Sequence, residues 1–444
     1  MLWVTLVLTL LVIVLGWIYP RFLLPLLILA LPLELSSDWF PHLTFLNKLG
    51  EFVGVIYFGR IFTLAVIAYY IFRIVWPEEK EWDISQNTRH SLINYIKSPL
   101  IVTLSAYLIW GALSILWSVD KTKTMVGVAR LGLLWVLGAA VYDLVKRKDG
   151  DFWVPITFAA ISTGLAGIGA FEMVSKHFIW KSEIYQLSGR INATFLDANI
   201  YARFLIIGCL ATIILMLGAP LKAKFAGGFA LLLQLLALVG TGSRTGWLAM
   251  LIVSVALAFL IPKRPVIITV LSGIVLGMAA VLLNPGIFAR LLEIKQNFGS
   301  ALTERSYLIT AGVEMFRGHP LWGVGLGGFQ KVMLTKYAAL IQNNVSLSHT
   351  ALITTAAELG MIGLGILTAF MAFLYERIPR AFRLQRTAQY QGIIPKMTYR
   401  TVFVILAVTA ILISAQGEGR FFEDPYLWIL VGYGAAIRNF EEVS

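Results

Sequence analysis

The sequence contains a single cysteine, Cys209, among 444 residues. One cysteine excludes a disulfide within the chain and a metal site built from several thiolates. The five histidines also lack the close spacing along the chain that is typical of metal ligands. We therefore expect neither a metal ion nor another cofactor.

Charged side chains are also scarce: they make up 14% of the residues, whereas hydrophobic residues make up 58%. Soluble domains are nearer about 25% charged and about 45–50% apolar. Apolar runs long enough to cross about 30 Å of hydrocarbon recur along nearly the whole chain. This composition excludes a soluble domain of ordinary size and predicts one integral membrane domain over residues 1–444.

The apolar runs predict an all-α, polytopic bundle of about 12–13 transmembrane helices. The first two runs meet at Pro20 and form either one hairpin or two spans. Met1 to Ile18 has neither a basic beginning nor a small-residue cleavage site, so we expect a retained helix. The expected helices lie near residues 2–18, 21–36, 54–76, 99–118, 126–145, 153–172, 200–217, 221–240, 245–261, 266–283, 350–374, 400–415 and 425–438.

The net charge of +12 raises the question of a nucleic-acid partner. In a membrane protein, cytoplasmic loops rich in Lys and Arg account for such an excess, so we expect contact with membrane lipids and no nucleic acid. Counting helices places four basic segments on one side, which we assign to the cytoplasm: 375–400, 146–148, 262–265 and the turn with Lys222 and Lys224. The other loops then face outward: 173–199, 241–245 and 285–348.

The outward insert 285–348 is long for a connection without function. Its stretch 301–318 carries apolar residues at three- and four-residue spacing, which predicts a helix. The sequence therefore predicts a partly helical periplasmic loop between two membrane helices. A structural plug or a lid over a pore is the alternative interpretation of this loop.

Three outward arginines, Arg190, Arg244 and Arg305, are candidates for binding a phosphorylated substrate. Arg190 and Arg244 lie in Gly-Arg-Ile-Asn-Ala-Thr-Phe and Gly-Ser-Arg-Thr-Gly-Trp, close to the starts of apolar helices. A guanidinium keeps its charge, and its forked donors match phosphate oxygens. The alternative for each arginine is contact with lipid headgroups or pairing with a carboxylate.

His349 ends the insert where the next apolar helix starts. An unperturbed imidazole suits a general base that removes a proton from an acceptor hydroxyl. A hydrogen-bonding residue at the helix start and a protonated phosphate ligand are the alternatives. Glu358 lies nine residues on, about 180° around the helix, so it is not an obvious partner of His349. A carboxylate at that depth needs another partner or a polar cavity.

The stretch Gly323-Val-Gly-Leu-Gly-Gly328 matches G-x-G-x-x-G. The dinucleotide fingerprint requires a strand before it and a helix after it in a soluble βαβ unit. Because this copy lies in a loop of a membrane protein, we reject a nucleotide site. We expect tight backbone packing or turns instead.

Taken in order, these pieces resemble the O-antigen ligase and O-antigen polymerase superfamily of bacterial envelope glycosyltransferases. The resemblance covers about 170 residues. It is carried by Arg190-Ile-Asn-Ala-Thr-Phe with Asn199, Gly242-Ser-Arg-Thr-Gly246, Arg305, Pro320-Leu-Trp-Gly-Val-Gly-Leu-Gly-Gly-Phe329, His349-Thr-Ala-Leu and Glu358-Leu-Gly360.

The resemblance implies a glycan donor carried on undecaprenyl pyrophosphate at the periplasmic face of the bacterial inner membrane. It implies metal-independent, inverting transfer in the synthesis of lipopolysaccharide or another envelope polysaccharide. Arg190, Arg244 and Arg305 would then bind the pyrophosphate. Arg305 and His349 would carry catalysis, with His349 activating the acceptor, and Asn199 and Glu358 would support the site.

Within the superfamily, ligases pass the glycan to lipid A–core or another acceptor, and polymerases pass it to the next lipid-linked repeat unit. We favour the ligase. Thr350 follows the histidine where ligases often have Asn, and this difference does not separate the two activities. A small-solute transporter is the second alternative. Transporters typically show paired repeats and interrupted helices with a site at mid-membrane, and this sequence shows no repeat.

Overall fold

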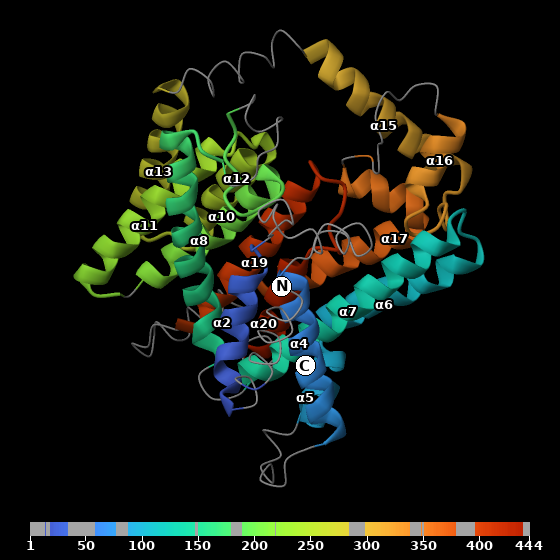
Figure 1. The fold of residues 1–444 in the computed structure, drawn as a ribbon, viewed down its shortest axis with the longest axis horizontal. Coiled ribbons are helices and arrows are strands. Elements are labelled where there is room, and N and C mark those ends of the chain that lie inside the picture. Colours follow the sequence, from blue (N-terminus) through green and yellow to red (C-terminus); the bar gives the residue numbers. More distant parts are fainter. Residues whose placement is uncertain are drawn as a thin grey trace, which may run out of the picture. The chain divides into compact units, whose positions relative to one another are not determined.

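The computed structural model describes residues 14, 18–33, 58–76, 88–146, 150–178, 189–217, 219–283, 298–337, 348, 350–378 and 396–437. Among these residues there are helices and turns but no strand, which confirms the all-α prediction (Figure 1). The principal helices are α2 (Leu23–Ala30), α4 (Phe58–Val75), α5 (Thr88–Lys97), α6 (Pro99–Leu113), α7 (Lys121–Lys146), α8 (Gly150–Ser175), α10 (Ala198–Met216), α11 (Leu221–Gly240), α12 (Arg244–Leu260), α13 (Arg264–Leu283), α15 (Phe298–Gly318), α16 (Phe329–Lys336), α17 (Ala351–Tyr375), α19 (Lys396–Ala415) and α20 (Pro425–Ala436).

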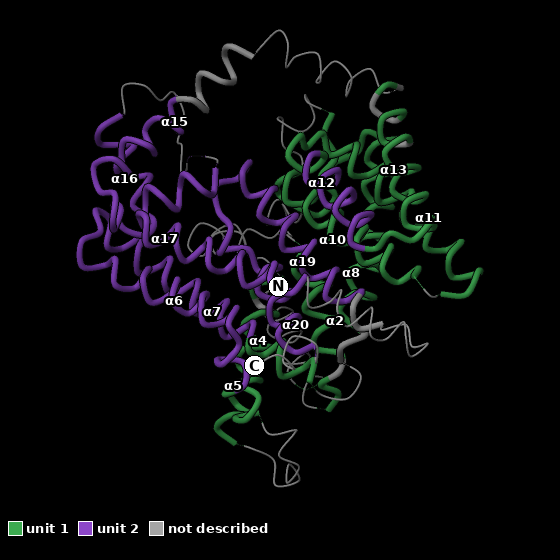
Figure 2. Tube along the Cα trace, turned by 180° about the vertical axis from the view of Figure 1, so that it is seen from behind, with its two compact units in different colours: residues 1–93, 139–247, 261–283 green, residues 94–138, 248–260, 284–444 purple. Residues whose placement is uncertain are grey.

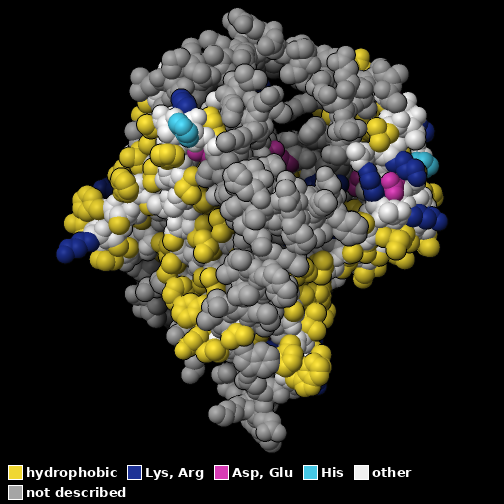
Figure 3. Space-filling model, viewed as in Figure 1, with side chains coloured by type: hydrophobic (Ala, Val, Ile, Leu, Met, Phe, Trp, Pro, Cys, Tyr) yellow, Lys and Arg dark blue, Asp and Glu magenta, His cyan; other side chains and the backbone are white. Residues whose placement is uncertain are grey.

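Six segments of the described chain are long and apolar enough to cross a membrane, and they lie in α6, α7, α8, α10, α11 and α17. Shorter apolar stretches of 10–17 residues lie in α4, α12, α13 and α19. Hydrophobic side chains such as Phe225, Phe229 and Phe259 are exposed, and hydrophobic groups cover much of the described surface (Figure 3). Helices of this kind expose such side chains to lipid, so the chain is a multi-pass membrane protein.

The chain divides into two compact units (Figure 2). Unit 1 comprises residues 1–93, 139–247 and 261–283, and in it α8, α10 and α11 pack against one another. The buried amide of Gln234 on α11 donates to Ser162 on α8 at 2.7 Å and bonds with Thr212 on α10 at 3.2 Å. The hydroxyls of Ser162 and Thr212 thus supply hydrogen bonds to the Gln234 amide. Without them, burying this polar group among apolar side chains would cost free energy.

Unit 2 comprises residues 94–138, 248–260 and 284–444. In it α17 contacts α6, α15, α16 and α19, and α20 packs against α19 and α6. Aromatic rings fill the centre: Phe370 of α17 lies edge-on to Phe421 and Phe422, and Phe422 also contacts Tyr107 of α6. This packing makes α17 the central helix of unit 2.

Helix α17 is interrupted at Gly360, where φ is 67° and ψ is −160°. Residues beyond the interruption donate to the loop before α16: Met361 N–H bonds to the Pro320 carbonyl at 2.8 Å and Ile362 N–H to the Leu321 carbonyl at 3.4 Å. In return, the carbonyls of α17 before the interruption accept from that loop. The apolar run near residues 350–374 predicted one continuous helix and did not indicate this interruption.

The glycine-rich loop 320–328 satisfies the polar groups that the interruption frees. The Ala357 carbonyl accepts from Val324 N–H at 2.9 Å, and the Glu358 carbonyl accepts from Gly325 N–H at 2.9 Å. The Leu359 carbonyl accepts from the Trp110 indole at 3.0 Å. Because backbone and indole N–H groups already bond to these carbonyls, the interruption is a site of contact between α17 and the loop. It does not resemble the ion site of a transporter, where free carbonyls coordinate the ion.

The same loop explains the G-x-G-x-x-G match. Gly323, Gly325 and Gly327 all have positive φ, and a Cβ on Gly323 would lie 2.4 Å from the carbonyl carbon of Glu358. Glycine is the residue that permits both the backbone conformation and this close approach. The expectation of tight backbone packing is therefore confirmed.

Most expected helices agree with observed ones within a few residues, and the helix expected at 301–318 is α15. Two short helices, α5 and α16, were not predicted. Both are polar: half of the ten residues of α5 are exposed, and α16 has only eight residues. Neither offers an apolar run, and periodicity over so few residues gives little signal.

Candidate functional site

Arg190 in unit 1 reaches the turn between α11 and α12. Its Nε donates to the Thr241 carbonyl at 2.7 Å, and one terminal nitrogen donates to the Asn199 side chain at 2.9 Å. The backbone at Ile191 adds a hydrogen bond to the Gly240 carbonyl at 3.1 Å. Two of the predicted site residues, Arg190 and Asn199, are thus in direct contact.

Arg244 begins α12, three residues after the Thr241 carbonyl that Arg190 contacts. Gly242 has a φ of 60° in this turn, and the Ser243 hydroxyl accepts from Gly246 N–H at 3.2 Å. That contact caps the N-terminus of α12 and fixes where the arginine emerges. The Arg244 side chain is exposed. Unit 1 therefore places Arg190 and Arg244 at one turn.

A buried carboxylate holds the loop that carries Arg190. Glu172 of α8 accepts N–H bonds from Asn192 at 3.2 Å and Ala193 at 2.9 Å. At the end of the loop, Asp197 accepts from Asn199 N–H at 2.6 Å and caps α10. These contacts fix the backbone that follows the arginine. Glu172 was not among the residues predicted from the sequence.

The remaining predicted residues belong to unit 2. The backbone of Arg305 lies in α15, as expected, and its side chain lies outside the described residues. His349 lies outside the described residues as well. Its neighbours are described: the Ser348 hydroxyl accepts from Thr350 N–H at 3.1 Å and bonds with the Thr354 hydroxyl at 2.8 Å. The roles of Arg305 and His349 stay predictions.

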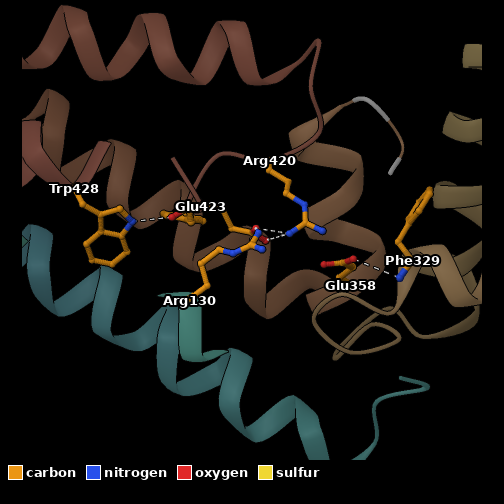
Figure 4. A network of polar contacts seen from close by, with 7 residues as sticks. Arg130, Phe329, Glu358, Arg420, Glu423 and Trp428 are labelled. Atoms are coloured by element: carbon orange, nitrogen blue, oxygen red, sulfur yellow. Dashed lines mark hydrogen bonds and ion pairs between the residues drawn. The ribbon is translucent and has the colours of Figure 1, made fainter. Parts of the chain in front are cut away.

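Glu358 is buried in α17, with 5% of its surface exposed. Its carboxylate accepts from the N–H of Phe329, the first residue of α16, at 3.3 Å. A helix N-terminus favours a negative charge. Figure 4 shows the guanidinium of Arg420 facing the same carboxylate. The expectation that this carboxylate has partners is thus confirmed.

Arg420 connects Glu358 to a second carboxylate, Glu423 (Figure 4). The Arg420 guanidinium binds both oxygens of Glu423, and Arg130 of α7 binds Glu423 from another side at 2.7 Å. Burial by itself lowers the pKa of Arg420, but the Glu423 carboxylate and its hydrogen bonds outweigh that effect and raise the pKa above its ordinary value. Arg420 therefore remains a cation.

This network was not predicted from the sequence. The polar stretch Gln416-Gly-Glu-Gly-Arg-Phe-Phe-Glu-Asp424 between two apolar helices was the available signal. Glu423 is 293 residues from Arg130, so chain spacing gave no reason to pair them.

Replacing Glu423 with glutamine is expected to destabilise the protein by about 2 kcal/mol, because Arg420 loses a charged acceptor. Arg130→Gln is the matched control. The Arg130 side chain is half exposed, and Arg420 would still compensate Glu423, so we expect a loss below about 1 kcal/mol. Thermal unfolding of the purified protein in detergent measures both variants. Equal melting temperatures for the two would contradict a central role for Glu423.

Among the described residues, no group of three or more His, Cys, Asp or Glu is arranged to hold a metal ion. Unit 1 instead has two arginines at the turn before α12. In unit 2, Arg420 lies between the buried Glu358 and the partly buried Glu423. The two arginines of unit 1 can bind an anion.

Residues 229–368 match the family model described as O-antigen ligase. That match confirms the resemblance to the O-antigen ligase and polymerase superfamily. The matched region contains Arg244, Arg305, His349 and Glu358, whereas Arg190 and Asn199 precede it. Among curated proteins, none matches this chain. The match supports glycosyl transfer in general terms.

Proposed function

We propose that this chain is a membrane glycosyltransferase that moves a glycan from undecaprenyl pyrophosphate to an acceptor, in the manner of an O-antigen ligase. The proposal depends above all on the contact between Arg190 and the Thr241 carbonyl. That contact holds Arg190 at the turn where Arg244 begins α12, inside the region matched by the ligase family. Two permanent cations at one turn suit the two phosphates of a pyrophosphate.

In the proposed reaction, the acceptor hydroxyl attacks the anomeric carbon of the donor sugar with inversion. His349 accepts the hydroxyl proton, and the bond between the anomeric carbon and the pyrophosphate oxygen breaks. Undecaprenyl pyrophosphate leaves with the bonding electrons. Arg190, Arg244 and Arg305 stabilise the charge that develops on that leaving group.

Contacts within unit 2 support a site on the periplasmic side. The parity of the basic loops assigns the α6–α7 turn, the glycine-rich loop and segment 416–424 to one face. Val119 N–H of the α6–α7 turn bonds to the Val324 carbonyl of the glycine-rich loop at 3.1 Å. Gln416 of segment 416–424 accepts from the N–H of Leu352, at the start of α17, at 3.3 Å. The contacts that hold these segments therefore agree with that assignment.

Reconstitution with an undecaprenyl-linked glycan and two acceptors tests the proposal. One acceptor is lipid A–core and the other is a second lipid-linked repeat unit. A single discrete product on lipid A–core would support a ligase, and a ladder of lengths would support a polymerase. No product with either acceptor would contradict the proposed function.

Arg244→Lys is expected to lower the transfer rate about tenfold, because an ammonium keeps the charge but loses the forked geometry. Arg264→Lys is the matched control, since Arg264 is also an exposed arginine at the first position of a helix in unit 1. Initial rates at equal membrane abundance compare the two. An equal effect of both substitutions would contradict a specific role for Arg244.

Transfer is expected to continue in EDTA, because arginines neutralise the pyrophosphate in the proposed mechanism. The sequence does contain one Asp-x-Asp pair, Asp149 and Asp151, of a kind that divalent ions use. It lies beside the basic segment 146–148, on the side that we assign to the cytoplasm, away from the arginines. The transfer rate before and after chelation measures this, and a rate abolished by EDTA and restored by magnesium would refute the metal-free mechanism.

A further inference from the structure

A separate pocket of about 200 Å³ lies in unit 2, between the end of α15, α16 and the start of the glycine-rich loop. Its volume is below the range of about 300–1,000 Å³ that is typical for drug-sized ligands. The pocket therefore suits one sugar residue or one headgroup, and not an extended chain.

Cationic and polar side chains line this pocket. Lys331 and Lys336 of α16 are both exposed, and neither has an ion-pair partner among the described residues. His319 and Thr335 add further polar atoms. Figure 3 shows Lys, Arg and His side chains gathered over this part of unit 2. Two unpaired ammonium groups beside a pocket attract an anion.

One carboxylate in the lining opposes that attraction. Glu314 of α15 accepts a hydrogen bond from the Tyr337 hydroxyl. Among the Lys and Glu residues of the lining, two lysines against one carboxylate leave a net charge of +1. Because Glu314 accepts the hydrogen bond from Tyr337, the two lysines are the main charged groups of the lining that can bind a ligand.

The other side of the pocket is apolar. Met315 of α15 and Val332 of α16 belong to a buried cluster, and Tyr337 packs against it. A sugar ring presents C–H groups on one face and polar substituents at its edge. An apolar wall beside cations thus matches a sugar that carries a negative charge.

We propose that this pocket binds a sugar residue bearing an oxyanion, either a carboxylate or a phosphate ester. Lys331 and Lys336 contact the oxyanion, and Met315, Val332 and the Tyr337 ring contact the sugar face. That this residue belongs to the transferred glycan or its acceptor rests on the proposed function. The binding itself does not.

Binding to the full-length protein in phosphatidylcholine nanodiscs tests the proposal, with thermophoresis as the readout. The probes are trigalacturonate, glucose 6-phosphate and neutral maltotriose. We expect one anionic probe to bind at least about tenfold more tightly than maltotriose, which corresponds to two ammonium contacts of modest strength. The double variant Lys331→Gln/Lys336→Gln is expected to lose that preference.

The matched control is Lys222→Gln/Lys224→Gln, which removes two exposed lysines from α11 and should keep the preference. Preferential binding of trigalacturonate assigns the site to carboxylates, and preferential binding of glucose 6-phosphate assigns it to phosphate esters. The proposal would be overturned if neither anionic probe bound more tightly than maltotriose. It would also be overturned if the preference for an anionic probe survived in the Lys331/Lys336 variant. Because no transfer is needed, a protein that binds the probe without transferring glycan contradicts only the proposed function.

Discussion

His349→Ala and Arg305→Ala are each expected to lower glycan transfer at least about 100-fold while leaving the protein folded in the membrane. Loss of a general base costs about 10²–10⁴-fold, and loss of one donor to a developing oxyanion costs about 10²–10³-fold. Initial transfer rates at equal membrane abundance measure both. Full activity in both variants would refute the site.

The contacts around His349 support the expectation of a preserved fold. The Ser348 hydroxyl bonds to Thr350 and Thr354, so the start of α17 is held without the imidazole. For Arg305, the matched control is Arg317→Ala, since Arg317 is an exposed arginine in the last turn of the same helix. We expect the Arg317 variant to transfer glycan at nearly the normal rate.

The pH profile separates the two chemical roles open to His349. A general base must be neutral, so the rate would fall as the pH drops through the pKa of the imidazole. A protonated phosphate ligand would give the opposite slope, with the rate falling as pH rises through that value. His349→Gln keeps a hydrogen-bonding group without titration. It is expected to remove the acidic limb of the profile along with most of the activity.

The membrane helices could be predicted well because lipid imposes a length and a composition on each span. The expected helix at 221–240 coincides with α11, and that at 200–217 differs from α10 by at most two residues at either end. Each of these helices satisfies its own backbone hydrogen bonds. Local sequence is therefore sufficient to indicate them.

The interruption of α17 could not be predicted because its partners are distant in the chain. An isolated glycine such as Gly360 is common in membrane helices. It becomes an interruption only because the Pro320 and Leu321 carbonyls accept the N–H groups that follow it. The information lies about 40 residues away, in a loop whose motif suggested turns and no partner.

The candidate site was predictable as residue types and not as contacts. The family resemblance predicted that Arg190, Arg244 and Asn199 belong to one site. The sequence contained no hint that Arg190 bonds to the Thr241 carbonyl, 51 residues away. Likewise, the cost of a buried charge predicted that Glu358 has a partner. That this partner is Arg420 could be learned only from the structure.

Gly360→Ala is expected to destabilise the protein by on the order of 3 kcal/mol. A φ of 67° with a ψ of −160° is accessible almost only to glycine, and forcing another residue into it costs about 1–3 kcal/mol. A Cβ would also lie 2.4 Å from both the carbonyl carbon and the carbonyl oxygen of Leu321. Because both are backbone atoms, the loop cannot relax by moving a side chain, and overpacking adds about 1–3 kcal/mol.

Gly365→Ala supplies the matched control in the same helix. A Cβ there meets nothing within 4 Å, and alanine is the better helix former, so we expect unchanged or slightly higher stability. Thermal unfolding in detergent measures both variants, and opposite signs are the expected result. Equal melting temperatures would mean that loop 320–328 does not cross α17 at Gly360. The hydrogen bond between Glu358 and the start of α16 would then be contradicted as well.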